Sequence, residues 1–89
     1  MASQLQPILI YGRPDCEDTE PVRERLNQLG IPFSEINVDE DEEAARFVEG
    51  VNGGYCSTPT ILFGDGALIV VEPTSAELDD ALRQAGYEV

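Results

Sequence analysis

The sequence has no histidine and no lysine, and it holds only two cysteines among its 89 residues. Without histidine, the chain cannot build a Cys–His nucleophile pair, a Ser–His–Asp triad or a histidine-ligated zinc site. Two cysteines are also too few for a four-cysteine metal or cluster site within one chain. The chemistry still open to the chain therefore centres on two thiols, Cys16 and Cys56.

Positive charge is scarce, because five arginines stand against 18 acidic residues and the net charge is −13. Such a chain repels phosphates and anionic membranes, so neither nucleic acid nor a membrane is an expected partner. We expect the acidity to keep a small protein soluble and monomeric. The alternative is a dedicated basic partner protein.

Long apolar runs are missing too. No stretch approaches the roughly 18 apolar residues of a membrane span, and residues 1–6 carry none of the basic residues of a signal peptide. We expect a cytoplasmic protein, in which stable disulfides are rare and cysteines are reactive or simply buried. The length and the apolar fraction of 42% predict one packed domain, residues 1–89.

Seven secondary-structure elements are expected from hydrophobic periodicity and turn residues. The expected strands are residues 7–11, 33–38, 60–63 and 67–71, with a hairpin turn at 64–66. The expected helices are 16–29, one capped by Asp39 with Glu42 in the capping-box position, and one capped by Thr74 with Glu77 in that position. Their apolar faces are Val22, Leu26 and Leu29, then Ala44, Phe47, Val48 and Val51, then Leu78, Ala81, Leu82 and Ala85.

The resulting order, β-α-β-α-β-β-α, predicts an α/β fold. The first two strands are joined through a helix, so they should be parallel with a right-handed crossover. The last two should form an antiparallel hairpin. The expected architecture is a mixed four-stranded sheet with three helices.

Cys16 is the strongest candidate for chemistry. It lies between an expected strand and helix, where backbone N–H groups and the positive helix end favour a thiolate. A thiolate is the nucleophile of disulfide exchange. The alternative is a buried, inert cysteine, but Cys16 lies in the polar segment 13–18.

Three segments carry a family resemblance. Residues 8–16, Ile-Leu-Ile-Tyr-Gly-Arg-Pro-Asp-Cys, resemble the first strand and active-site loop of glutaredoxins. Residues 57–66, which begin Ser-Thr-Pro-Thr, are similar to the Thr-Val-Pro segment and hairpin of that family. Residues 52–54 and 72–78 look most like those of mycoredoxins and ribonucleotide-reductase redoxins, so the resemblance spans residues 7–85.

The resemblance implies a thioredoxin-like fold with Pro59 in cis, facing Cys16. It further implies that the backbone of Thr58 pairs with a glutathione or peptide disulfide and that Arg13 holds a substrate carboxylate. No cofactor is required, and glutathione is implied as a co-substrate. Taken alone, Thr58–Pro59 also fits a proline at the start of a strand.

The chain departs from the family at the second cysteine of Cys-x-x-Cys, which is Thr19. A dithiol mechanism within this motif is therefore excluded, although Thr19 could donate a hydrogen bond to the Cys16 thiolate. The site also differs from the Cys-Gly-Phe-Ser of cluster carriers. Cys56 is either a resolving thiol or a bystander. Tyr11 and Tyr55 either line a groove or pack in the core or its rim.

Acidic residues make a second departure. Glu17, Asp18 and Glu20 oppose a thiolate, while Arg13 favours one, and we expect a thiol less acidified than in a typical glutaredoxin. The family's glutathione-binding Gly-Gly-x-Asp is replaced by Glu-Pro-Thr-Ser at 72–75. Here Ser75 could cap the helix and offer N–H groups to a carboxylate, whereas the charge of Glu72 would repel one.

The sequence thus favours a glutaredoxin-like thiol–disulfide oxidoreductase, acting through Cys16 by a monothiol mechanism on mixed or glutathionylated disulfides. The main alternative is a non-catalytic binding module of the same fold that recognises a protein partner. An iron–sulfur cluster carrier, with Cys16 and glutathione bridging two subunits, is a minor alternative.

Overall fold

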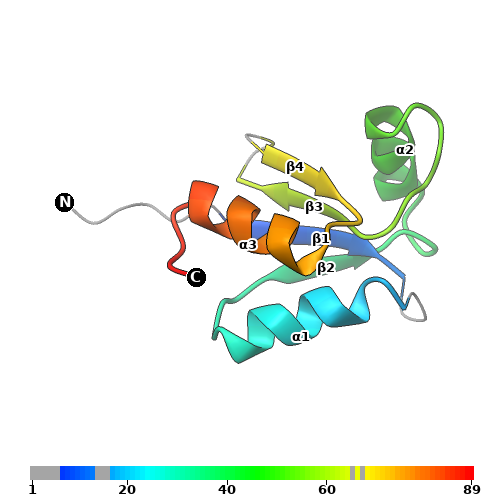
Figure 1. Ribbon diagram of the computed structural model, residues 1–89. Helices are drawn as coiled ribbons and strands as arrows, with labels where there is room; N and C mark the ends of the chain where they lie inside the picture. Colours follow the sequence, from blue (N-terminus) through cyan, green and yellow to red (C-terminus); the bar gives the residue numbers. More distant parts are fainter. Residues whose placement is uncertain (1–6, 14–16, 65, 67) are drawn as a thin grey trace.

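The computed structural model describes residues 7–13, 17–64, 66 and 68–89. The elements are β1 (Ile8–Gly12), α1 (Glu20–Gln28), β2 (Ser34–Asn37), α2 (Glu42–Val51), β3 (Thr60–Phe63), β4 (Leu68–Val71) and α3 (Ser75–Gln84). The expected order is confirmed (Figure 1). None of the helices within these ranges is long and apolar enough to cross a membrane.

The four strands form one mixed sheet in the order β2-β1-β3-β4. β1 runs parallel to β2, with Ile10 opposite Glu35, as a strand–helix–strand crossover requires. β3 pairs antiparallel with both β1 and β4, which confirms the predicted hairpin. The chain therefore has the α/β fold expected from its sequence.

The helices cover the two faces of the sheet unequally. α1 and α3 lie together on one face, and α2 lies on the other, near the end at which β1 finishes (Figure 1). The larger core cluster fills the first face and includes Ile10, Leu26, Phe63 and Leu82, each with no exposed surface. The smaller cluster, under α2, consists of four buried residues: Tyr11, Val38, Ala44 and Val48.

The start of α1 differs from the expectation of a helix from Cys16. The helix begins at Glu20, after a turn at residues 17–19, while Cys16 itself lies outside the described residues. Pro21 explains the start, since a residue without a backbone N–H is tolerated only in the first turn of a helix. The proline thus sets the helix boundary.

The expected cap of α2 is also wrong. Asp41, and not Asp39, is the N-cap, and its Oδ1 accepts a 3.1 Å hydrogen bond from the backbone N–H of Ala44. Asp39 is instead held in the preceding turn, where its own N–H donates to Oδ1 of Asn37 at 2.9 Å. A row of acidic residues offers several equivalent caps, so local sequence does not choose among them.

The apolar face predicted for α2 is buried only in part. Ala44 and Val48 are buried, but Phe47 and Val51 are 38% and 39% exposed. The helix covers one end of its sheet face, so only the positions nearest the sheet reach the core. By contrast, the predicted face of α3 is buried throughout: Leu78, Ala81, Leu82 and Ala85.

The capping box of α3 is confirmed. The hydroxyl of Thr74 accepts from the N–H of Glu77 at 3.1 Å, and the Glu77 carboxylate accepts from the N–H of Thr74 at 2.8 Å. Two backbone donors at the helix start are thereby satisfied.

The cap of α2 gives a stability prediction. Replacing Asp41 by alanine removes the acceptor for the Ala44 N–H and should lower the free energy of unfolding by about 1 kcal/mol, measured in urea. Asp41→Asn keeps a capping oxygen and should stay close to the wild type. Equal losses in the two variants would show that the hydrogen bond does not stabilise α2.

Candidate active site

Four segments converge at the end of the sheet where β1 finishes. They are the end of β1, the turn before α1, the loop between α2 and β3, and the link between β4 and α3 (Figure 1). The predicted nucleophile Cys16 lies outside the described residues. The candidate site is therefore built from the residues on either side of it and from those that they contact.

The Thr58–Pro59 peptide bond is cis, as the resemblance implies. Both residues are buried, with Thr58 only 8% exposed. The loop is fixed from two sides. Pro59 accepts a 2.8 Å hydrogen bond from the N–H of Glu72, and the hydroxyl of Thr60 donates to the carbonyl of Ser57 at 2.8 Å.

Arg13 joins β1 to this loop. Its Nε donates to Oδ1 of Asp39 at 2.8 Å, and its Nη1 donates to the carbonyl of Cys56 at 3.4 Å and to the hydroxyl of Thr58 at 3.5 Å. The hydrogen bond to Asp39 raises the pKa of Arg13. The structure thus brings three predicted site residues together. It adds Asp39, which sequence reasoning placed at a helix cap.

Thr19 occupies the position of the missing second cysteine. It is fully buried, and its hydroxyl is the sole buried side-chain oxygen in the described part of the chain without a hydrogen-bond partner. It packs over Gly12, where an added Cβ would lie 3.1 Å from Cγ2 and 3.2 Å from Oγ1 of Thr19. A buried hydroxyl without a partner is energetically costly.

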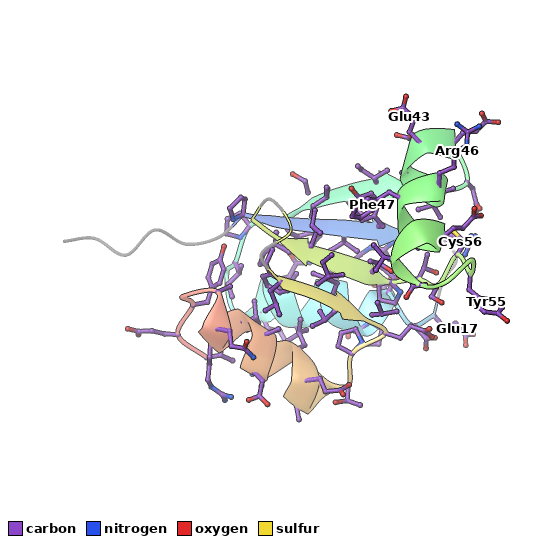
Figure 2. All side chains as sticks on the ribbon, turned by 90° about the horizontal axis from the view of Figure 1, so that it is seen from above. Glu17, Glu43, Arg46, Phe47, Tyr55 and Cys56 are labelled. Carbon is purple, nitrogen blue, oxygen red and sulfur yellow. The ribbon has the colours of Figure 1, made fainter. Side chains whose placement is uncertain are left out.

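Cys56 is half-buried and has a free thiol. Figure 2 shows it at the same end of the molecule as Tyr55 and Glu17. Tyr55 is 75% exposed, whereas Tyr11 is buried and packs against Phe47 with ring centroids 5.1 Å apart. Tyr11 is therefore a core residue, and burial, together with the charge of Asp41, raises its pKa. Pairing of Cys56 with Cys16 stays a prediction.

Ser75 lies beside a cavity of about 380 Å³ between the starts of α1 and α3. Asp18 and Glu72 contribute carboxylates to this site cavity, which also includes Pro21, Pro73 and Thr74. Ser75 does not cap α3, because Thr74 is the N-cap and Ser75 is the first helical residue. No group of three or more potential metal-binding side chains occurs among the described residues.

Glu72 has a conformation that sequence reasoning did not anticipate. It is the one described residue other than glycine with positive φ, at 46°. A side chain in the left-handed region crowds its own backbone, at a cost of roughly 1–2 kcal/mol. In this conformation, the N–H of Glu72 donates a hydrogen bond to the carbonyl of Pro59. No local sequence signal announces this geometry, because glycine is the usual residue at such positions.

Comparisons with known proteins agree on the family that this chain resembles. A family model described as Glutaredoxin matches residues 8–69. Mycoredoxin 1 of Corynebacterium glutamicum is 32% identical over 71 residues, covering 80% of this chain and 86% of that protein. A Mycobacterium tuberculosis protein with a glutaredoxin name is 30% identical over 71 residues, covering 80% and 83%.

Solved structures show the same likeness. The glutaredoxin of Archaeoglobus fulgidus superposes with a TM-score of 0.68 at 27% identity, covering 88% of this chain and 87% of that chain. A thioredoxin-like protein superposes with a TM-score of 0.65 at 29% identity, covering 84% and 97%.

The backbone of Glu72 gives a second stability prediction. Glu72→Gly relieves the left-handed strain but adds freedom to the unfolded chain. It should raise the free energy of unfolding by up to about 1 kcal/mol in a urea titration. Glu72→Ala keeps the strain and serves as the control. If glycine and alanine give equal stabilities, the strain at residue 72 is not real.

Proposed function

The chain belongs to the glutaredoxin family of thiol oxidoreductases, and from that premise we propose that Cys16 carries out disulfide exchange by a monothiol mechanism. The observation that carries the proposal is the cis Thr58–Pro59 loop, tied through Arg13 to the end of β1. Cys16 follows Arg13 by three residues in the chain. A backbone segment that is held in place can pair with a substrate disulfide segment.

The proposed reaction has two exchange steps. The Cys16 thiolate attacks one sulfur of a disulfide R–S–S–R′, forms the mixed disulfide with R–S, and releases R′–S⁻, which takes up a proton. A second thiol, R″–SH, loses its proton and attacks R–S as the thiolate. Cys16 leaves as a thiolate, and the product is R–S–S–R″. The sum of the two steps consumes one external thiol, R″–SH, and releases one thiol, R′–SH, while the number of disulfides is unchanged, so no resident cofactor is needed.

The second thiol comes from outside the motif, because Thr19 has no sulfur. We propose glutathione or another low-molecular-weight thiol as the resolving co-substrate, with Cys56 as the alternative. We further propose that the backbone of Thr58 pairs with the substrate. Arg13 orders the cis-proline loop, and its guanidinium, which is shared with Asp39, also faces the substrate's carboxylate. The proposed setting is a monomer in the cytoplasm.

Two serine variants test the assignment of the thiols. The assay measures by chromatography the reduction of a glutathionylated peptide in the presence of an external thiol. This activity should be lost in Cys16→Ser and retained in Cys56→Ser. In Cys56→Ser, omission of the external thiol should accumulate a mixed disulfide on Cys16, seen as added mass. A Cys16→Ser protein as active as the wild type would overturn the proposal. So would a wild type without activity, which would favour a non-catalytic binding module.

The unpartnered hydroxyl of Thr19 gives a further prediction. We propose that it donates to the Cys16 thiolate, so Thr19→Val, which keeps the shape, should raise the Cys16 pKa and slow exchange about tenfold. The folded state loses no other hydrogen bond, so its stability in urea should not fall. The pKa is measured by ultraviolet absorbance of the thiolate in a Cys56→Ser background.

Thr19→Ser is the matched control. It keeps the hydroxyl but removes the methyl that packs over Gly12, so stability should fall by about 1 kcal/mol while the Cys16 pKa stays near the wild-type value. An unchanged pKa in Thr19→Val would show that the hydroxyl does not act on the thiolate.

A further inference from the structure

Every positive side chain of the protein is already paired. The five arginines are all described, lysine and histidine are absent from the sequence, and each arginine forms an ion pair with a carboxylate at 2.5–3.7 Å. Arg13, the arginine at the candidate site, is held by Asp39. An anionic substrate therefore meets no uncommitted cation at this end of the molecule.

Two carboxylates that line the site cavity have no ion-pair partner among the residues that the structure describes. Within the described ranges, neither Asp18 nor Glu72 has an ion-pair partner, and both line the cavity of about 380 Å³. Asp18 follows Cys16 by two residues in the chain. Glu72 is hydrogen-bonded through its N–H to Pro59 of the cis-proline loop. The two negative charges therefore lie at a cavity next to the loop that is proposed to bind the substrate.

An exposed aromatic ring lies at the same end of the molecule. Tyr55 is 75% exposed, and Figure 2 shows it projecting beyond Cys56, toward the side on which Glu17 lies. Its loop is held in place at both ends, since Gly54 donates to the carbonyl of Glu49 at 2.7 Å and Cys56 accepts from Arg13. An exposed aromatic ring at the same end of the molecule as these carboxylates suits a cationic side chain, because rings and carboxylates both attract positive charge.

We propose that this protein is selective for disulfides that carry positive charge beside the reacting sulfur, such as a protein cysteine flanked by lysine or arginine. The inference rests on the function proposed above and names its substrate class. Asp18 and Glu72 are the residues that set the selectivity, and Tyr55 adds a surface for the rest of a peptide. The net charge of −13 reinforces the same preference at longer range.

The size of the effect follows from the exposure of the charges. Each solvated charge pair changes a rate by a few-fold, so two carboxylates should separate cationic from anionic substrates by roughly tenfold at low salt. The separation should shrink as salt rises, because the Debye length falls to about 8 Å at physiological ionic strength.

The test uses three peptides that differ only in the residue beside a single cysteine: lysine, glutamine or glutamate. Each is supplied as the mixed disulfide with 2-mercaptoethanol, and 2-mercaptoethanol is also the resolving thiol, so neither small thiol carries charge. Initial rates of peptide thiol release are followed by chromatography at low and high salt. Wild-type rates should fall in the order lysine, glutamine, glutamate, with about tenfold between the extremes at low salt.

A pair of double variants separates the cavity from the overall charge. Asp18→Asn with Glu72→Gln removes both cavity carboxylates, and the peptide rates should then agree within about twofold. Glu43→Gln with Glu88→Gln changes the net charge equally at exposed positions outside the cavity and should keep the wild-type order. The Tyr55→Ala variant is compared with the wild type on the lysine peptide and on cystamine, a small disulfide with two ammonium groups. This comparison shows whether the preferred positive charge belongs to a peptide or to a small molecule. A slower rate for the lysine peptide, but not for cystamine, supports a peptide substrate.

The outcomes are distinct. Equal rates for the three peptides with the wild type overturn the inference and leave the proposed function standing. Equal loss of preference in both double variants also overturns it, because selectivity then comes from net charge. If Tyr55→Ala slows neither substrate, the peptide contact is overturned. If the wild type reduces none of the peptides, the proposed function itself fails.

Discussion

The guanidinium of Arg13 is the contact on which the candidate site depends. It binds Asp39 beyond the end of β2, the carbonyl of Cys56 and the hydroxyl of Thr58. These groups lie on segments that are far apart in the chain. Without this cation, the loop before β3 would lose the hydrogen bonds at Cys56 and Thr58, and Asp39 would be one more unpaired charge in a strongly acidic protein.

The acidity of the chain is tolerated because its few cations are well distributed. Each arginine has a carboxylate partner, and Arg23 has two, Glu20 and Glu35, which connect α1 with β2. Surface pairs of this kind stabilise little individually. Among the described residues they neutralise six carboxylates, so many acidic residues, Asp18 and Glu72 at the site cavity among them, keep a charge without an ion-pair partner.

The elements with a local physical cause were predictable from sequence. The capping box of Thr74 and Glu77, the end of α1 shortly before Gly30, which has a φ of 70°, and the pairing of β3 with β4 all rest on contacts within a few residues. The start of α1 was misplaced because a pattern of apolar residues shows which face of a helix is buried but does not mark its first residue. Pro21, which is tolerated only in the first turn, sets that residue. The cap of α2 was misplaced because the carboxylate of Asp39 accepts a hydrogen bond from Arg13, which is 26 residues away in the chain, and Asp41 caps the helix instead.

The candidate site divides in the same way. The residue types at the site could be identified from the family resemblance, and the cis peptide bond was implied by it. The orphan hydroxyl of Thr19 and the positive φ of Glu72 could not be identified. Both arise from tertiary packing, the first against Gly12 and the second against Pro59, and neither leaves a periodic signal along the chain.

The geometry at Glu72 has an evolutionary consequence. The same residue supplies a charge to the site cavity and occupies a backbone conformation that suits glycine. Any glutamate codon becomes a glycine codon by a single nucleotide change. Residue 72 is therefore one mutational step from an uncharged side chain and a less strained backbone. Folding and substrate choice therefore oppose each other at this position. A lineage that adopted an anionic thiol could change specificity without first acquiring a compensating mutation elsewhere.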